Sequence, residues 1–479
     1  MAFDPDVLTT YPSSARERTA IRMIPFIVGC ALFMQMLDST VVATALPAMA
    51  VSLETTPVKM NVAITSYLLA LAVFVPISGW AADRFGAKRV FIAAIVLFTL
   101  SSIGCALSHN LPQLVVARVV QGIAGAMMVP VGRIILLRKI PKTELLKAMS
   151  FLSLPALFGP IIGPPLGGFL VTYASWHWIF LINIPVGILG IALIMRYIPD
   201  DMPMSAPRLD WIGFILSGVC LATLVSGFEA LGHSDTTGFN LALLLGTGLL
   251  CGLLYVWHAR HAKHPIIDLS LLRTPTFAIS VLGGNLCRFA VGASPFLLAL
   301  LLQVGFGLSP FAAGMITFTS AAGAIIMKLV AAPIIKHFGF KRVLMVNALL
   351  TGGFVMLCGL FRPDTPVWLM IIVLVTGGFF RSLQFTAVNT LTYADMSSAD
   401  MSRASSFASM AQQLGISLGV GCAATVLNIS MNWRGASHLE LVDMTWGFVV
   451  IGLLACASFF SFLRLAPDAA DHLNHKAVG

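Results

Sequence analysis

Only two acidic residues lie inside the long apolar runs of this 479-residue sequence, Asp38 and Glu229. An ionisable side chain within hydrocarbon is costly, so such residues are candidates for function by default. Burial favours a neutral carboxylic acid, whereas a nearby arginine favours the carboxylate. A buried acid beside a basic residue can therefore take up and release a proton.

Arg118 is the expected partner of Asp38. Asp38 lies eight residues from the end of the apolar run 22–46, and Arg118 lies six residues into the run 112–136. At 1.5 Å per residue these positions are about 12 Å and about 9 Å deep from the same side. We expect Asp38 and Arg118 to form a proton-coupling site, with Glu229 as a further candidate. The alternatives are a static Asp38–Arg118 ion pair and a solvated, interfacial Glu229.

Two arginines, Arg288 and Arg381, fall near the middle of later apolar runs, and Gln384 lies one helical turn from Arg381. Because no acid falls within any expected span of the second half, the sequence predicts an electropositive cavity wall suited to anionic or zwitterionic substrates. The alternative is that these arginines bind helix carbonyls and join helices. Phe33, Met34 and Gln121 complete the predicted substrate cavity.

The elements that must position these residues are membrane-spanning helices. Hydrophobic residues make up 58% of the chain, charged residues make up 10%, and the mean hydropathy is +0.92. A soluble domain carries about 25% charged residues. A bilayer core needs about 20 apolar residues per helix. Fourteen runs meet this need: 22–46, 61–80, 88–107, 112–136, 146–170, 176–197, 211–231, 239–258, 275–303, 311–332, 342–360, 366–390, 404–428 and 445–464.

The distribution of lysine and arginine predicts the orientation. Twenty-one of the 29 basic residues fall in the N-terminus, the even-numbered loops and the C-terminal tail, against three in the odd-numbered loops. Cytoplasmic segments carry the excess of basic residues. We therefore expect a multi-pass protein of the inner (cytoplasmic) membrane with both termini in the cytoplasm. The net charge of +9 then needs no nucleic-acid partner.

A short internal repeat suggests two related halves. Residues 85–90 (FGAKRV) follow the second run, and residues 338–343 (FGFKRV) follow the tenth. These positions are equivalent if the seventh and eighth runs are an insertion, an organisation common in transporters. The expected domains are a cytoplasmic N-terminus (1–21), a six-helix bundle (22–197), a linker with two helices (198–274), a second six-helix bundle (275–464) and a cytoplasmic tail (465–479).

Four segments of the first half carry recognisable patterns: 37–47 (LDSTVVATALP), 79–89 (GWAADRFGAKR), 118–126 (RVVQGIAGA) and 159–168 (GPIIGPPLGG). Glycines permit tight turns and close helix approach. Prolines remove backbone donors and can bend a helix.

Together these segments resemble the fourteen-helix drug:proton antiporters (EmrB/QacA type) of the major facilitator superfamily, closest to the MdtD-like branch. The resemblance implies an all-α integral membrane protein with the major facilitator fold, in which 14 transmembrane helices form two six-helix bundles plus two linker helices. It implies a conformational latch at Gly79, Asp83, Arg84, Gly86 and Arg89. It also implies an antiporter motif at Gly159, Pro160, Gly163, Pro164 and Gly167. Ala43 departs from the family's usual asparagine, and Lys336 takes the place of Asp83 in the second-half loop.

Other chemistry finds little support in the sequence. The eight cysteines form no CxxC pair, and His258, His261 and His264 lie among basic residues, so we expect no disulfide, metal site or cofactor. We expect a transporter and not an enzyme. Its partners would be a small-molecule substrate, protons and the lipid bilayer, and it would function as a monomer, with a periplasmic adaptor protein left open.

The predicted function is export of small molecules, as in multidrug efflux, in exchange for protons by alternating access. The alternatives are a dedicated proton-coupled exporter of one metabolite, such as an organic anion, and a membrane sensor on a transporter fold. Proton-driven uptake is disfavoured by the pattern at 159–168.

Overall fold

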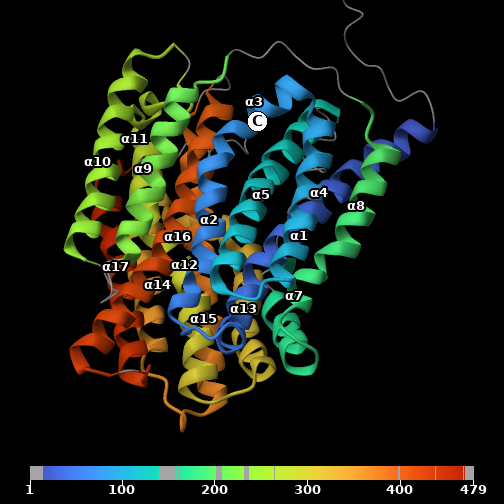
Figure 1. The fold of residues 1–479 in the computed structure, drawn as a ribbon. Coiled ribbons are helices and arrows are strands. Elements are labelled where there is room, and N and C mark those ends of the chain that lie inside the picture. Colours follow the sequence, from blue (N-terminus) through green and yellow to red (C-terminus); the bar gives the residue numbers. More distant parts are fainter. Residues whose placement is uncertain are drawn as a thin grey trace, which may run out of the picture.

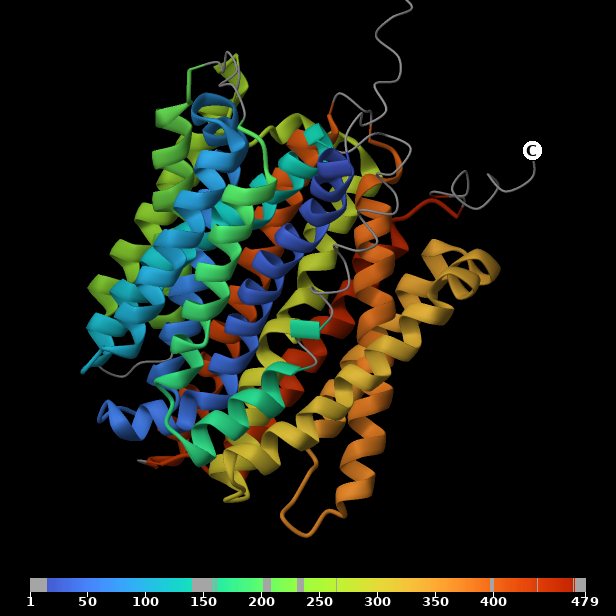
Figure 2. The ribbon, with the colours of Figure 1, turned by 90° about the vertical axis from the view of Figure 1, so that its right-hand side faces the viewer.

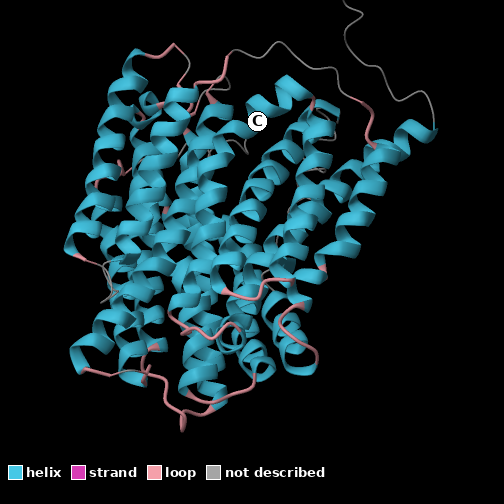
Figure 3. Ribbon diagram, in the orientation of Figure 1, coloured by secondary structure: helices cyan, strands magenta, loops and turns pink. Residues whose placement is uncertain are grey.

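The computed structural model describes residues 15–139, 158–159, 162–200, 208–230, 237–263, 265–396, 400–436, 438–467 and 469. Within these ranges it does not describe the side chains of residues 15–22, 137, 139, 229, 329, 332 and 402. Throughout the described ranges the chain is helix joined by short loops, with no strand (Figure 3). This is the architecture that lipid permits, because hydrocarbon offers no partner to an unpaired backbone group.

The helices of the first part of the chain are α1 (Ala15–Ser52), α2 (Val62–Phe74), α3 (Ser78–Phe85), α4 (Ala87–Ala106), α5 (Leu111–Lys139), α7 (Trp178–Leu181), α8 (Asn183–Tyr197), α9 (Trp211–Ala230) and α10 (Gly238–His261). The later helices are α11 (Pro275–Ala278), α12 (Gly284–Leu300), α13 (Pro310–Phe338), α14 (Phe340–Cys358), α15 (Val367–Ala394), α16 (Met401–Arg434) and α17 (Leu441–Leu463). Short 3₁₀ segments lie before and after α2, at Lys59–Asn61 and Val75–Ile77. The π-helical turns Ile279–Gly283 and Leu301–Gly305 lie before and after α12.

Thirteen helices of the described chain are long and apolar enough to cross a membrane. They correspond to all of the expected spans except the fifth, 146–170. That span is described only at 158–159 and from 162 onward, where residues 162–173 are helical. The all-helical membrane fold predicted from hydropathy is thereby confirmed.

The helices form a tall bundle with two ends (Figures 1 and 2). The turn between α3 and α4 lies at one end, here called the Asp83 end, and α7 lies at the other, here called the distal end (Figure 1). Large apolar side chains remain exposed on the sides of the bundle, for example Leu249, Leu253 and Trp257 of α10. Such a surface suits contact with lipid.

Helix packing joins neighbours within each part of the chain and across it. In the first part α5 packs on α1, α2 and α4, and α8 packs on α1 and α4. In the later part α13 packs on α15, α12 on α16, and α14 on α15 and α17. The two parts meet where α2 lies against α16 and α1 against α12, while α9 packs on α10, α2 and α16. The domain boundaries at 197, 274 and 464 stay a prediction.

The internal repeat has the same backbone conformation in both copies. Gly86 has a φ of 90° and precedes α4, and Gly339 has a φ of 76° and precedes α14. Both values fall in a region that residues with a Cβ rarely adopt. The glycine therefore sets the same helix–turn–helix at residues 85–90 and 338–343.

Candidate functional site

Asp38 forms a buried ion pair with Arg118 near the middle of the first part of the bundle. The Arg118 Nη1 atom lies 2.6 Å from Asp38 Oδ2. The two residues are 1% and 0% exposed, respectively, so neither charge reaches solvent. Each charge therefore depends on its neighbours for stabilisation, as the depth estimate from the sequence predicts.

Amide groups complete the surroundings of the Asp38 carboxylate. Gln121 Nε2 donates to Asp38 Oδ1 over 3.0 Å, and Asn183 Nδ2 donates to the same oxygen over 3.3 Å. Both amides also donate to Ser102 Oγ, over 2.9 and 3.1 Å. The Asp38 network thus joins α1, α4, α5 and the first residue of α8.

Arg118 is held just as closely on its other sides. Its Nε donates to the Ala63 carbonyl oxygen over 2.9 Å, and its Nη1 donates to Gln121 Oε1 over 2.5 Å. The guanidinium carbon lies 4.6 Å from the ring centre of Tyr67 and 5.5 Å from that of Phe180, both within cation–π range. Protonation of Asp38 would remove the counter-charge of Arg118, which hydrogen bonds hold in a fixed position. A change in the charge of Asp38 would therefore alter the contacts of every helix in the network.

The glycines of the fifth span lie against α1 at the turn that carries Asp38. A Cβ added at Gly159 would lie 2.6 Å from Met36 Cβ, one at Gly163 would overlap Thr40 Oγ1, and one at Gly167 would lie 2.9 Å from Val41 Cγ1. Pro160 lies outside the described residues. The small residues thus let the fifth span approach α1 more closely than any side chain would allow.

The same segment also faces the later part of the bundle. A Cβ added at Gly168 would overlap the Pro310 carbonyl oxygen, and one at Gly314 would overlap the carbonyl oxygen of Pro164. Gln303 Nε2 donates to the Thr44 carbonyl oxygen over 2.8 Å, and the Phe311 amide donates to Thr172 Oγ1 over 3.1 Å. At the distal end, therefore, the two parts of the chain are in contact.

Next to the turn between α3 and α4, Asp83 in the last turn of α3 forms an ion pair with Arg138 of α5. Arg84 and Arg89 are exposed. A Cβ added at Gly79 would meet nothing within 4 Å, so the close helix approach expected at this glycine is absent from this conformation. Gly86 provides the turn, as described above.

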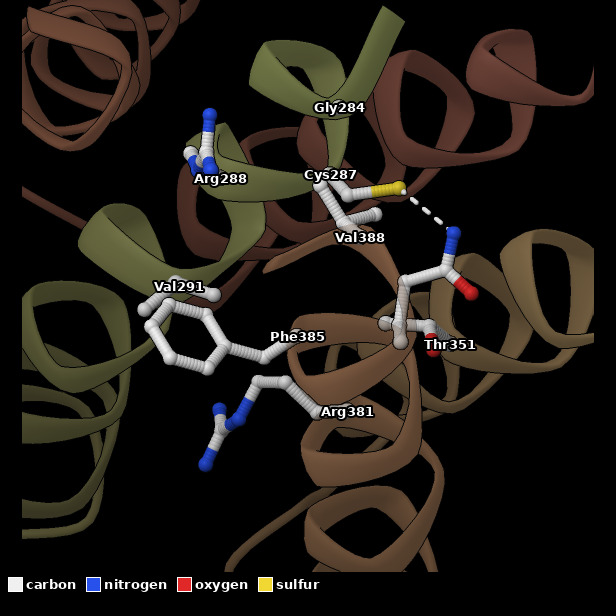
Figure 4. A pocket seen from close by; sticks show the side chains of 9 residues that line it. Gly284, Cys287, Arg288, Val291, Thr351, Arg381, Phe385 and Val388 are labelled. Atoms are coloured by element: carbon white, nitrogen blue, oxygen red, sulfur yellow. Dashed lines mark hydrogen bonds between the residues drawn. The ribbon is translucent and has the colours of Figure 1, made fainter. Parts of the chain in front are cut away.

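The later part of the bundle holds a pocket between α12, α14 and α15 (Figure 4). Its lining includes Arg288 and Cys287 of α12, Thr351 of α14, and Arg381, Gln384 and Phe385 of α15. The structure thus brings the predicted residues Arg288, Arg381 and Gln384 to one pocket. Gln384 is itself bonded, with its Oε1 accepting from Asn347 Nδ2 over 2.9 Å and its Nε2 donating to Cys287 Sγ over 3.3 Å.

Neither arginine of this pocket forms an ion pair among the described residues. Arg288 is 3% exposed and donates only to Asn285 Oδ1 and Asn389 Oδ1, over 3.1 and 3.2 Å. Arg381 donates to Ser320 Oγ over 3.4 Å. In the described chain neither arginine donates to a backbone carbonyl, but both join helices through side-chain acceptors, α12 to α15 at Asn389 and α15 to α13 at Ser320. The choice between a substrate-binding and a helix-joining role stays open.

The expectation that no acid lies within a second-half span is wrong. The last span begins at Leu441 and not at 445, so it includes Asp443, which is fully buried. Asp443 accepts from Ser430 Oγ over 2.6 Å and pairs with Arg434 Nη2 at 2.5 Å. Its side chain and that of Glu440 cap the first turn of α17, which explains why the helix starts earlier than hydropathy suggests.

The remaining predicted residues lie in different surroundings. Phe33 is half-buried and Met34 is fully buried in α1, and neither lines the pocket. Gln121, predicted for the substrate cavity, is instead part of the Asp38 network. Glu229 lies in the last turn of α9, and its side chain is outside the described residues.

Comparison with known proteins identifies the family of this chain. The family model described as Major Facilitator Superfamily matches residues 28–292 and 280–478, which together cover most of the chain. The chain belongs to the major facilitator superfamily. It is therefore a membrane transporter and not an enzyme, as the sequence predicts.

Relatives within the superfamily are similar over nearly their full length. The "Putative multidrug resistance protein MdtD" of Pectobacterium atrosepticum is 40% identical over 457 residues, covering 94% of this chain and 97% of the relative. The protein of that name from Serratia proteamaculans is 44% identical over 452 residues, covering 93% and 94%. The resemblance to MdtD-like transporters is confirmed.

Solved structures show the same fold at low identity. An auto-inhibited peptide transporter of the POT family aligns with a TM-score of 0.69 and 15% identity, covering 93% of this chain and 97% of that one. The nucleoside transporter NupG aligns with a TM-score of 0.64 and 13% identity, covering 92% and 99%. At this identity the match concerns the fold alone, and it confirms the predicted major facilitator fold.

The sequence did not predict several residues of the Asp38 network and of the pocket. Asn183, Ser102 and Tyr67 carry no charge, and their spacing to Asp38 along the chain has no regularity, so nothing in the sequence joins them to it. Thr351 was missed for the same reason. A signal was available only for Asp443, as an acid next to a long apolar run.

Proposed function

We propose that this chain is a secondary transporter that exports small molecules, as in multidrug efflux, in exchange for protons by alternating access. The observation that carries the proposal is the Asp38–Arg118 ion pair, closed off from solvent by Gln121 and Asn183. The names of the MdtD relatives support multidrug export. We place the protein in the inner membrane, with both termini in the cytoplasm, as the excess of basic residues there indicates.

Protonation of Asp38 is the proposed switch. An ionised Asp38 neutralises Arg118, and the two charges compensate each other inside the bundle. A neutral Asp38 leaves Arg118 buried without its counter-charge, an unfavourable state that opening to water or rearrangement would relieve. Substrate binding would favour the conformation with an ionised Asp38, and proton binding would favour the other, so export and proton entry would alternate.

The contacts at the distal end are where this switch would act. Asp38 and Thr44 are both on α1, and the Thr44 carbonyl accepts from Gln303 of the later part. The glycines of the fifth span hold that segment against the same turns of α1 and bring it to Pro310. A change at Asp38 can therefore be passed to the contacts that must separate for the distal end to open, while the Asp83–Arg138 loop would latch the other end.

The test is substrate-driven proton flux in proteoliposomes that contain a pH-sensitive dye. Wild type, Asp38→Asn and the control Asp364→Asn would be compared over a panel of hydrophobic cations, zwitterions and anions. Asp364 is an exposed acid in the loop between α14 and α15, so its loss removes charge without touching the network. We expect flux from wild type and Asp364→Asn and none from Asp38→Asn, with each protein monodisperse by size-exclusion chromatography.

Coupled flux retained in Asp38→Asn would make Asp38 structural and Glu229 the next candidate. Absence of flux from every variant with every compound would favour a dedicated exporter of one metabolite or a sensor on a transporter fold. A dedicated exporter would be recognised by competition from one narrow chemical class.

A further inference from the structure

The pocket between α12, α14 and α15 combines two guanidinium groups with no acidic partner among the described residues. Each guanidinium has five N–H donors. Across both arginines, the hydrogen bonds to described residues are two from Arg288 and one from Arg381. Arg288 Nε is buried without any partner, and so is the Thr351 hydroxyl on the facing helix. Donors therefore exceed acceptors in this pocket.

Such an excess is costly unless water or a ligand supplies acceptors, and water supplies no counter-charge. A buried cation without a counter-charge and a buried donor without an acceptor both destabilise the folded chain. The acid of the Asp38 network does not serve here, because among the described residues its ion pair is with Arg118 and its other donors are Gln121 and Asn183. Asp443 is likewise bound by Arg434 and Ser430. The acceptor must therefore come from outside the described chain.

The rest of the lining is apolar. The exception is Gln384, which is already bonded to Asn347 and Cys287. Phe385, Val291 and Val388 form walls beside the arginines, and Figure 4 shows the Phe385 ring between Arg288 and Arg381. A simple inorganic anion would use the charges and leave these walls without a partner. An organic anion with a hydrophobic body would use both.

We infer that this pocket binds the carboxylate, or a similar anionic group, of an amphipathic organic anion through Arg288 and Arg381, with Thr351 as a further donor. Guanidinium groups suit this task because their fork of donors matches a carboxylate in two-point geometry. As a substrate site the pocket rests on the proposed transport function, which it deepens by naming a substrate class. In the conformation described, the pocket has a volume of about 10 Å³, which is the space of one water molecule. The hydrophobic body of the anion would therefore enter only when α12 and α15 move apart, and the binding test is read separately from proton flux.

The test is equilibrium binding to the full chain in lipid nanodiscs, by calorimetry, with no proton gradient. Three probes share one ring system and differ in charge: naphthoate, naphthamide and naphthylmethylammonium. We expect naphthoate to bind about tenfold more tightly than naphthamide, since a charged acceptor forms a stronger hydrogen bond than a neutral one. The ammonium probe should bind more weakly than the amide.

Two variants assign the preference to the arginines. Arg381→Gln and Arg288→Gln should each weaken naphthoate binding about tenfold and leave naphthamide nearly unchanged. The matched control is Arg133→Gln, because Arg133 is an exposed arginine of α5 outside the pocket. Where Arg288→Gln does not fold, Arg381→Gln, which gives up a single 3.4 Å hydrogen bond, carries the test.

Equal affinities of wild type for naphthoate and naphthamide would overturn the inference, as would unchanged naphthoate binding in both arginine variants. Asp38→Asn should bind naphthoate as wild type does. A failure of proton coupling with the naphthoate preference intact would therefore reject the proposed function and keep the pocket, and the reverse result would do the opposite.

Discussion

The two halves of this transporter share a turn geometry, but their two candidate sites surround arginine differently. In the first half Arg118 contacts an acid, the amide oxygen of Gln121 and two aromatic rings. In the second half Arg288 and Arg381 have asparagine and serine side chains and no acid among the described residues. The first arrangement is complete without a ligand, and the second is not.

This difference separates two tasks that a coupled transporter must perform. A site that responds to protons needs a titratable acid whose state changes the balance of an internal network. A site that recognises a solute needs donors or acceptors that the protein itself leaves unused. We propose that each half performs one of these tasks. The second half also holds a buried acid, Asp443, but Arg434 pairs with it and it lies outside the pocket.

The largest predicted effect is on stability, and it comes from replacing the arginine of each half in turn. Arg118→Met would leave the Asp38 carboxylate buried without its cation, and we expect a loss of about 3–5 kcal/mol in the free energy of unfolding. Arg288→Met removes a cation that has no acid, so its loss should be clearly smaller. Denaturant unfolding of the two variants in the same detergent measures the difference.

The double variant Arg118→Met with Asp38→Asn provides the control. It removes both charges, so it should recover part of the stability lost in Arg118→Met. Equal stability of Arg118→Met and Arg288→Met would contradict the distinction between the halves.

A second prediction concerns the close approach of the fifth span to α1. Gly163→Ala would place its Cβ on Thr40 Oγ1, and overpacking of this kind costs about 1–3 kcal/mol. Thr40→Ala in the same chain should restore part of the loss, because it removes the overlapping oxygen. Gly353→Ala in α14 is the control, since nothing lies within 4 Å of a Cβ there. Thermal unfolding compares the three, and a Gly163→Ala protein as stable as Gly353→Ala would be evidence against the contact.

A third prediction makes the second half resemble the first. Asn389→Asp would place a carboxylate at the position that now accepts from Arg288 over 3.2 Å. The new acid would compete with an external anion, so naphthoate affinity should fall about tenfold while naphthamide affinity stays the same. Calorimetry in nanodiscs measures both, and an unchanged naphthoate affinity would count against the role of Arg288.

The smallest predicted effect is at the loop that both halves share. Asp83–Arg138 is a partly exposed ion pair, and the second-half loop has Lys336 where the first has Asp83. Asp83→Asn and Arg138→Gln should each lower the free energy of unfolding by less than about 1 kcal/mol. The loss should disappear at high salt. Thermal unfolding at low and high salt tests this, and a loss that high salt does not reduce would assign the pair a buried role.

Much of the fold could be predicted because it follows from hydropathy and from a repeated loop. The glycine shared by 85–90 and 338–343 has the same backbone conformation in both copies, as an equivalent position requires. The ends of the helices were harder to predict from the sequence. The start of α17 at Leu441 depends on a cap by Glu440 and Asp443, and a hydropathy window sees those residues only as charge.

The candidate site could be predicted where the depth of two residues in the membrane is enough to place them in contact. Asp38 and Arg118 lie at similar depths, so their pairing could be expected from two positions in the sequence. The amide of Asn183 could not be assigned, because its place beside Asp38 depends on how α8 leans on α1 and α4. Gln121 shows the same limit, since one polar residue on α5 could face a cavity or the acid, and packing selects the acid.

The position of α9 bears on the order in which the molecule is assembled. Phe214 of α9 contacts Phe74 of the second span with ring centres 5.3 Å apart, and the Phe228 carbonyl accepts from Thr425 of α16 over 3.2 Å. Nascent α9 is inserted long before α16 leaves the ribosome. Only 17% of the α9 span and 11% of the α10 span are buried in the protein. This hairpin must therefore lie in lipid before α16, one of its packing partners, has been synthesised. Because its surface is nearly all apolar, the hairpin is stable in lipid before it packs against α16.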